Sequence, residues 1–586
     1  MDKYIPTGNE FVSLPTINEN TAAIESISFL YMAQKGMVEL RGTDERPLIA
    51  PFVRRGSEDV PLTALEWRRE HWWIPVMTAR AGEAMLTMTV LAPIGERGFG
   101  IKLSLTDGDE QTRFGLRGAF GAAMHCVNED KPIEGTRHLY QSGWNGSFIF
   151  DMRSSFPLFA FAPMADREAL CEFTEDASSY SVYTRSGENE LTVWWGLGFE
   201  EVAAATSAKE MLRRTWEYEY GKTAAWLDAR AKTLRTDKLT EIYNTNLFFC
   251  IFYSTGITLD TEELICATSR SSRYYVSAAY WDRDTLLWAF PAILDVDTAL
   301  AKRILEYVFT RQSRNIGVHS RYIDGTVLEP GFELDELIAP ILALSAYIDK
   351  TCDMRFKQER FVSDSIKHIL ETLSEMKHPA YYLYETFLQP TDDERVYPYL
   401  TYDNMLVWKG MKVLAALYPE EYAALDGEAD KIRAAIYENC VFTDTDGKRY
   451  FGWSVDLKGH HDIYDEPPGS LQLLPYYGFC GFDDEIWQNT VDMIRSPAYK
   501  YSFAGYPIAE IGCPHAPYPW VLSLCNSMLC GHSEQTLGEL ERIRMDNGIA
   551  CESVDAVTGE CTTGAAFATC AGFLCRAIRC ASEVEE

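Results

Sequence analysis

The sequence predicts a multi-domain protein with α and β structure, in which an N-terminal antiparallel β-sandwich is followed by an (α/α)6 barrel. Three observations favour this fold class: the chain has 586 residues, short alternating apolar runs fill its first third, and helical patterns fill the rest. A chain of this length exceeds one ordinary hydrophobic core, so two domains are expected. We expect the sandwich domain at 1–205, a helical linker at 206–235 and the barrel at 236–586.

The region from about residue 10 to 200 alternates between apolar and polar positions in short runs. The runs are MLTMTVLAP, FGIKLSLTDGDE, RFGLRGAF, SFIFDM, LFAFAP and SYSVYTRSGENELTVWWGLGF. Period-two alternation with Asp-Gly and Ser-Gly turns is typical of the antiparallel strands of a sandwich. From Ser207 the segment SAKEMLRRTWEYEYGKTAAWLDARAKTL changes to a helical period, which predicts the linker.

Beyond about residue 236 the chain shows successive helical patterns and no convincing strand alternation. Twelve helices are expected to begin near Leu239, Arg283, Thr298, Asp335, Lys357, Tyr402, Gly427, Pro468, Asp483, Tyr518, Ser533 and Thr563. Twelve helices suggest six antiparallel hairpins. A closed ring of hairpins would bury the inner helices and gather alternate loops at one end, where we expect an active-site funnel.

The charge and the aromatic content of the chain indicate which class of molecule it binds. Lys and Arg number 54 against 86 Asp and Glu, so the net charge of −32 repels nucleic acid and anionic membranes. Aromatic residues make up 13% of the chain, and their rings often face sugars as well as cores. A neutral small-molecule substrate therefore fits better than a charged polymer.

Targeting signals, cofactors and metals are not expected. The N-terminal residues lack an apolar targeting core, and no run of 18 or more apolar residues occurs, which predicts a soluble, cytoplasmic protein. The 15 cysteines lack paired C-x-x-C spacing and lie in apolar segments, as reduced core residues do. His460 and His461 are adjacent, and adjacent side chains rarely converge on one ion.

Two segments between the expected helices carry unusual polar and aromatic residues. In YWDRDTLLWAF, Trp281, Arg283 and Asp284 precede an apolar helix. An N-cap aspartate beside a packed tryptophan explains this pattern, and so does an Arg and Asp pair that holds two hydroxyls of one sugar. In EPGFELDELIAPILAL, Asp335 and Glu336 suit a first helical turn. Neither segment is specific by itself.

A third segment, QPTDDERVY, sets Asp392 and Asp393 side by side between the fifth and sixth expected helices. A solvated turn explains its residue types. Alternatively, two adjacent carboxylates among tyrosines would repel each other and lose solvent, so at least one pKa would rise as a general acid requires.

The fourth segment, GIACESVDAVTGE, places Glu552 just before a turn, where a lone glutamate is normally solvated. Asp392 and Glu552 are 160 residues apart in the sequence. They fall on the fifth-to-sixth and eleventh-to-twelfth helix connections, which face each other across the funnel of a closed six-hairpin ring. This combination favours a functional interpretation of both carboxylates.

The last 350 or so residues resemble the metal-independent exo-α-mannosidases of glycoside hydrolase family 125 and, more distantly, other (α/α)6 glycosidases. The resemblance runs in order through WDRDT, FELDE, QPTDDERVYPYLTYDNM, SLQLLPYYGF, IWQNTVDMIRSP, GCPHAPYPWVLSL and ACESVDAVTGE. It implies an inverting reaction in which Asp392 protonates the leaving oxygen and Glu552 activates water. Asp393 is the alternative acid. The two carboxyl groups of such a pair stand roughly 6.5 to 9.5 Å apart.

The same resemblance implies which residues bind a terminal sugar. Trp281, Arg283, Asp284 and Asp335 would hold the sugar, and His515 and Trp520 would line the pocket. Three features depart from the family: Cys551 stands where the family has histidine, PHAPYPW lacks a glycine, and ECTTGAAFATCAG lacks the aromatic-rich ending. The N-terminal sandwich is also foreign to the compact mannosidases.

We therefore expect an inverting exo-acting α-glycoside hydrolase that acts on a small carbohydrate, most simply an α-mannosidase. An α-glucosidase of the same architecture is the alternative. A glycoside phosphorylase and a non-catalytic sugar-binding protein stay open as further hypotheses. The sequence leaves the linkage, the aglycone and the oligomeric state open.

Overall fold

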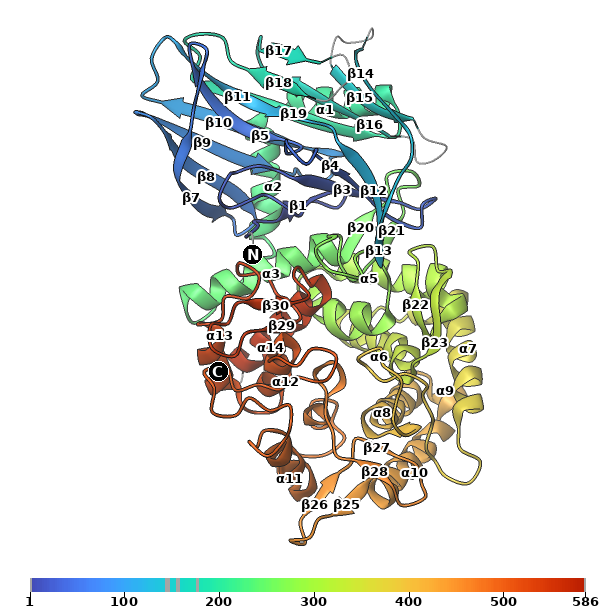
Figure 1. Ribbon diagram of the computed structural model, residues 1–586. Helices are drawn as coiled ribbons and strands as arrows, with labels where there is room; N and C mark the ends of the chain where they lie inside the picture. Colours follow the sequence, from blue (N-terminus) through green and yellow to red (C-terminus); the bar gives the residue numbers. More distant parts are fainter. Residues whose placement is uncertain (1–2, 143–147, 154–158, 175–178, 584–586) are drawn as a thin grey trace. The chain divides into compact units, whose positions relative to one another are not determined.

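The computed structural model describes residues 3–142, 148–153, 159–174 and 179–583. The chain divides into two compact units. Unit 1 comprises Met1–Lys232 and Phe252–Ala278, and unit 2 comprises Thr233–Ile251 and Ala279–Glu586. In Figure 1 the blue and cyan strands belong to unit 1, and the yellow to red helices belong to unit 2.

Unit 1 contains three large antiparallel sheets, as the alternating sequence predicted. The eight-stranded sheet runs in the order β14 (Thr136–Gln141), β15 (Phe148–Arg153), β16 (Phe159–Ala165), β19 (Glu190–Gly198), β10 (Gly98–Thr106), β9 (Ala84–Leu91), β8 (Ile74–Ala81) and β7 (Leu62–Glu70). The six-stranded sheet runs β1 (Thr7–Gly8), β2 (Val12–Leu14), β3 (Ser26–Tyr31), β4 (Gly36–Arg41), β12 (Ala122–Val127) and β13 (Glu129–Pro132). The five-stranded sheet runs β17 (Leu170–Phe173), β18 (Tyr180–Tyr183), β11 (Thr112–Gly118), β5 (Ala50–Arg55) and β6 (Glu58–Val60).

All three sheets contribute side chains to one apolar core. Along β9, Leu86 and Met88 are buried while Thr87 and Thr89 are only partly buried, which is the period-two alternation of a strand with one face inside. The core joins these residues to Phe29 of β3 and to side chains of β11. Burial of the inner sheet faces is the main stabilising term of unit 1.

Two helices follow the last large strand of unit 1. α1 (Glu201–Arg214) begins six residues before the predicted Ser207, and α2 (Trp216–Asp228) follows it. α1 packs across β16 and β19. Gly196 allows this close approach, because a Cβ there would lie 2.1 Å from the carbonyl oxygen of Ala204.

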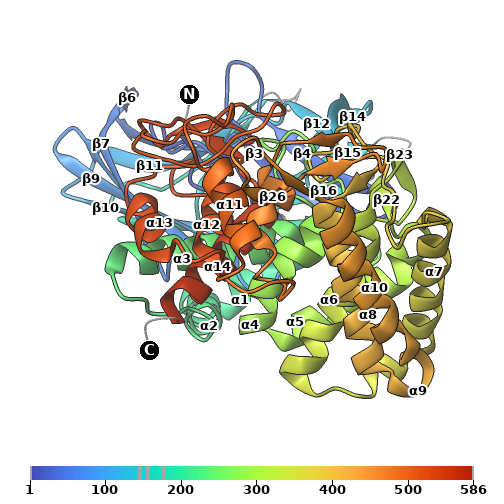
Figure 2. The same cartoon turned by 90° about the horizontal axis from the view of Figure 1, so that it is seen from below.

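Unit 2 is mainly helical, and eleven of the twelve predicted α-helices begin within several residues of the expected position. They are α3 (Asp237–Ser254), α4 (Phe290–Val296) after the π-helical η1 (Arg283–Ala289), α5 (Thr298–Tyr307), α6 (Leu334–Thr351), α7 (Arg360–Met376), α8 (Thr401–Leu417), α10 (Ala424–Asn439) after the short α9 (Pro419–Tyr422), α11 (Glu485–Ile494), α12 (Val521–Leu529), α13 (Ser533–Leu540) and α14 (Ala568–Glu583). In Figure 2, α5, α6, α8 and α10 lie side by side, in agreement with their packing.

Two sequence predictions for the chain beyond residue 236 are wrong. The helix expected near Pro468 is replaced by two 3₁₀ turns, η5 (Pro467–Gly469) and η6 (Leu471–Leu473), because two prolines and a glycine do not sustain an α-helix. Short strands also return: β20 (Thr255–Ile257) with β21 (Leu264–Cys266), β22 (Val318–Arg321) with β23 (Val327–Phe332), β24 (Tyr399–Leu400) with β27 (Ser454–Val455) and β28 (His461–Asp462), β25 (Val441–Thr443) with β26 (Arg449–Phe451), and β29 (Ser553–Val554) with β30 (Cys561–Thr563). Strands of two to six residues are too short to show a clear alternation.

Several helices of unit 2 are buried on every side. All nine residues of α12 are buried, and α6 and α8 are buried along most of their length. Helices that are apolar all round belong to the interior of a protein. None of the described helices combines the length and apolarity that crossing a lipid bilayer requires.

Candidate active site

Arg283 is the centre of a buried ion network in unit 2. Its side chain begins η1 and is 2% exposed, and irregular π-helical turns of this kind are frequent at functional sites. Nη1 donates to Glu333 Oε2 at 2.6 Å and to Asp335 Oδ2 at 3.1 Å. Nη2 donates to Asp392 Oδ1 at 2.6 Å. One cation thus joins the start of α6 to the loop that precedes α8.

The loop that carries Asp392 and Asp393 is a tight turn. The amide of Asp392 donates to Gln389 O at 2.8 Å, and the amide of Gln389 donates to Asp393 O at 2.9 Å. Asp392 has φ 67°, in the left-handed region where a non-glycine residue is strained. Its side chain is 34% exposed. Within the described part of the chain, Oδ2 of Asp392 accepts no hydrogen bond, so this oxygen is open to a ligand.

Glu466 accepts hydrogen bonds from this loop and so fixes it, a role that the sequence did not reveal. It is fully buried, and it accepts hydrogen bonds from the amide of Thr391 at 3.1 Å, the Thr391 hydroxyl at 3.0 Å, Gln389 Nε2 at 2.9 Å and the Tyr464 hydroxyl at 3.1 Å. Burial raises the pKa of Glu466 well above its ordinary value. Three of the four contacts, those with Thr391 and Gln389, fix the residues immediately before Asp392.

Asp393 points to a different partner. Its carboxylate lies 3.4 Å from His515 Nδ1, and the side chains are 53% and 30% exposed. The hydrogen bond from His515 lowers the pKa of Asp393. Conversely, Asp393 is the main cause of a raised pKa of His515, and the charges of Glu552 and Asp392 raise it further. The charges of all three predicted catalytic carboxyl groups thus raise the pKa of His515.

Glu552 is held by the β29–β30 hairpin and by α12. It is 2% exposed, and its Oε1 accepts a hydrogen bond from the Thr563 hydroxyl at 2.8 Å. Its carbonyl accepts the amide of Val521 at 3.0 Å, at the first residue of α12. Trp520, which precedes that helix, is buried and donates from Nε1 to Ala516 O at 2.9 Å. The backbone thus ties Glu552 to the predicted pocket residue Trp520.

The remaining predicted sugar-binding residues surround Arg283. Asp335 lies in the first turn of α6, as predicted, and contacts Arg283 directly. Asp284 is 5% exposed and accepts a hydrogen bond from the Thr569 hydroxyl at 2.7 Å, and burial raises its pKa to about 7. Trp281 is buried and contacts His319, with ring centroids 5.5 Å apart and planes at 79°.

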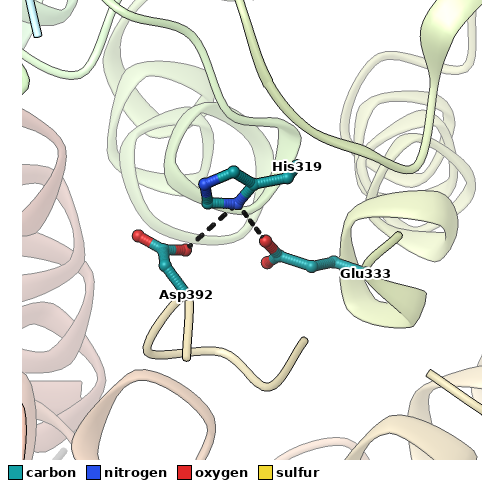
Figure 3. A group of neighbouring side chains, drawn as sticks. All are labelled: His319, Glu333 and Asp392. Atoms are coloured by element: carbon teal, nitrogen blue, oxygen red, sulfur yellow. Dashed lines mark hydrogen bonds and ion pairs between the residues drawn. The ribbon is translucent and has the colours of Figure 1, made fainter. Parts of the chain in front are cut away.

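His319 and Glu333 are further members of this site that the sequence analysis missed. Figure 3 shows the imidazole of His319 between the carboxyl groups of Glu333 and Asp392. His319 Nδ1 bonds to Glu333 Oε1 and lies 3.8 Å from Asp392 Oδ1. Burial lowers the pKa of His319, but the contact with Glu333 outweighs it and the net pKa is raised. His319, Ser320 and Arg321 of β22 are all buried, so no alternation in this short strand could have shown which of them faces the site.

Among the described residues, these three side chains are spaced closely enough to bind a metal ion together. One ligand atom from each of His319, Glu333 and Asp392 lies within 4.8 Å of the others. Arg283 donates to both carboxylates of this group. A metal ion would therefore have to share these oxygens with a buried guanidinium, and the guanidinium already supplies the positive charge that they require.

Comparison with known proteins connects this geometry to a family. Residues 382–579 match the family described as metal-independent alpha-mannosidase (GH125). This part of the chain is a GH125-type glycoside hydrolase domain. The matched region contains Asp392, Asp393, His515, Trp520 and Glu552, whereas the Arg283 segment and α6 precede it. No curated protein sequence matches the chain.

Solved structures share the fold of this glycoside hydrolase at low sequence identity. A Streptococcus pneumoniae metal-independent α-mannosidase, crystallised with α-1,6-mannobiose in a non-productive complex, is 19% identical with a TM-score of 0.52 and covers 59% of this chain and 94% of its own. A bacterial glucoamylase in complex with acarbose is 13% identical with a TM-score of 0.64 and covers 100% and 95%. A putative kojibiose phosphorylase from the human microbiome is 11% identical with a TM-score of 0.59 and covers 98% and 86%.

Proposed function

We propose that the protein is an inverting, exo-acting α-glycoside hydrolase that removes a terminal sugar from small oligosaccharides or glycosides, and that the sugar is mannose. The observation that carries this proposal is the position of two carboxyl groups in the GH125-type region. Asp392 lies in the loop before α8, and Glu552 lies in the segment before α14. The charges of both carboxyl groups raise the pKa of His515. We further propose that the helices of residues 236–586 form the (α/α)6 barrel, following the sandwich of residues 1–205 and the linker of 206–235.

In this mechanism Asp392 is the general acid and Glu552 is the general base. The open oxygen of Asp392 gives its proton to the glycosidic oxygen, and the bond from that oxygen to the anomeric carbon breaks. Water attacks the anomeric carbon from the opposite face and gives a proton to Glu552, so the configuration inverts. The Thr563 hydroxyl fixes the Glu552 carboxylate for this task. Asp393 is the alternative acid, but its contact with His515 lowers its pKa.

The terminal sugar is bound by the residues around the ion network. A guanidinium and several carboxyl groups can pair with neighbouring hydroxyls of one sugar, and aromatic rings cover its apolar face. The residues proposed for this are Trp281, Arg283, Asp284, Asp335, His515 and Trp520. His319 and Glu333 join them through their direct contacts with Asp392 and Arg283.

The experiment is hydrolysis of a panel of α-mannosides and α-glucosides with detection of the product anomer by NMR. We expect β-anomeric sugar as the first product. Asp392→Asn and Glu552→Gln should each lower kcat by about 10²- to 10⁴-fold, whereas the exposed control Asp483→Asn should not. No released monosaccharide, or full activity in both variants, would contradict the proposal.

An α-glucosidase is the second candidate, because the bacterial glucoamylase shares the fold over the whole chain, including the N-terminal sheets. The ratio of rates on mannosides and glucosides separates the two. A phosphorylase would need phosphate in place of water and would leave Glu552 without a task, so phosphate dependence of turnover tests it. A non-catalytic protein would bind sugar in calorimetry without turnover.

A further inference from the structure

A cavity of about 760 Å³ lies beside the loop that carries the proposed acid. Gln389, Asp393 and His515 form the side of this cavity next to the proposed site. In an exo-acting hydrolase the acid protonates the oxygen of the leaving group, so the leaving group must lie on the acid's side of the sugar. This cavity is therefore where the leaving group of the proposed reaction would lie.

Three tyrosines also line the cavity, and the hydroxyls of two of them are hydrogen-bonded within the protein. The Tyr464 hydroxyl donates to Glu466 at 3.1 Å. The Tyr499 hydroxyl donates to Asp465 O at 2.8 Å and accepts the amide of Asp465 at 3.0 Å. The ring of Tyr501 packs edge to face against both, at 6.1 and 5.9 Å. The three tyrosines thus bring aromatic ring surface to the cavity.

Two large aliphatic side chains at the same cavity are exposed to solvent. Val396 is 65% exposed and Ile463 is 46% exposed, and both line the cavity. Exposed apolar side chains that gather around one hollow commonly mark a binding site. Polar side chains such as Asp462 and Lys500 also line the cavity, so its apolar part is the surface formed by Val396, Ile463 and the tyrosine rings.

We propose that this cavity binds an apolar or aromatic aglycone, so that α-glycosides of large apolar or aromatic alcohols are preferred over those of small alcohols. The proposal rests on the proposed function. Hydrolysis adds water across the glycosidic bond: the sugar gains the hydroxyl at its anomeric carbon, and the aglycone leaves as its alcohol with the proton from the acid. Tyr464 connects the cavity to the acid's loop, because its partner Glu466 also holds Thr391.

The test compares glycosides whose leaving alcohols have similar acidity. We measure kcat/KM for 2-phenylethyl and methyl α-mannoside and for the matching α-glucosides. Burial of a phenyl ring predicts a preference of at least about tenfold for the 2-phenylethyl glycoside. The double variant Val396→Asn with Ile463→Asn should remove most of this preference and leave kcat/KM for the methyl glycoside within about twofold. Val202→Asn, at a valine of α1 that is 48% exposed, is the matched control.

Binding of the non-hydrolysable 2-phenylethyl and methyl thioglycosides, measured by calorimetry, is run in parallel. If the protein hydrolyses no glycoside, the proposed function fails, and the binding preference still decides whether the cavity takes the apolar group. Equal kcat/KM and equal affinity of the wild-type protein for the 2-phenylethyl and methyl compounds overturn the inference. So does a double variant that weakens the methyl and 2-phenylethyl compounds to the same extent.

Discussion

Replacing Asp284 by asparagine should stabilise unit 2 at neutral pH. Asp284 is 5% exposed, and burial raises its pKa from 3.8 to about 7. The Asp284 carboxyl group therefore binds a proton more tightly in the native state than in the unfolded state. As a result, the free energy of unfolding falls as the pH rises from about 4 to 7. The full effect is on the order of 4 kcal/mol, at 1.36 kcal/mol for each pKa unit.

Asn keeps the oxygen that accepts from the Thr569 hydroxyl and carries no charge at any pH. The stability gain of Asp284→Asn should therefore be about 2 kcal/mol at pH 5 and about 4 kcal/mol at pH 8, and it should fade below pH 4. Urea unfolding followed by tryptophan fluorescence at pH 4 to 8 measures it. The exposed Asp483→Asn is the control. The proposed destabilising effect of the Asp284 charge would be refuted if the difference in the free energy of unfolding between variant and wild type did not change with pH. A variant less stable than the wild type at pH 8 would also refute it.

Three further changes test the packing of the site, and a fourth, Gly427→Ala, is the control for the first. Gly469→Ala should lower the free energy of unfolding by about 1 to 3 kcal/mol and reduce kcat, because its Cβ would lie 2.6 Å from Pro390 of the acid's loop. Gly427→Ala, in a helix with no atom within 4 Å of the new Cβ, should instead stabilise by up to about 1 kcal/mol; both are measured by urea unfolding. Glu466→Ala should cost roughly 3 to 6 kcal/mol in thermal or urea unfolding, because it leaves several buried donors without an acceptor. Arg283→Lys should lower kcat/KM at least about tenfold, since an ammonium cannot bridge the carboxylates as a planar guanidinium does; unchanged kinetics would contradict its bridging role.

Asp284 also shows why stability and the proposed activity are in tension. A buried carboxyl group with few partners destabilises the fold at neutral pH, and such groups are typically kept where a ligand needs them. The Asp284→Asn variant is therefore expected to be more stable yet slower. If the Asp284→Asn variant hydrolyses more slowly but is no more stable, the proposed role of Asp284 in sugar binding stands and its proposed cost in stability does not.

Much of the fold follows from local sequence. The alternation in β9 and the helical period of α1 identify their elements without any tertiary information. The region around Pro468 failed because helix prediction there depended on flanking apolar residues, whereas the two prolines determine the backbone. The hairpin of β22 and β23 failed because each strand is too short for a period to emerge.

The site was less accessible to sequence reasoning, since its contacts join distant segments. Arg283 and Asp392 are 109 positions apart, and no local spacing predicts their bond. Their segments were singled out for their polar and aromatic residues, and the resemblance of the ordered motifs to a family then implied their roles. Glu466 had no signal at all, because in DEPPGS a buried anchor and a solvated turn have the same residue types.

The electrostatics of the site bear on which acceptor it can use. Burial raises the pKa values of Glu333, Glu336 and Asp403, which all lie near Arg283. Carboxyl groups with raised pKa values hold protons and can donate hydrogen bonds to neutral sugar hydroxyls. Phosphate as an attacking group would need a cationic partner, and the guanidinium of Arg283 is already hydrogen-bonded to Glu333, Asp335 and Asp392. This balance of charge favours water as the acceptor, and turnover that does not respond to added phosphate is the expected result.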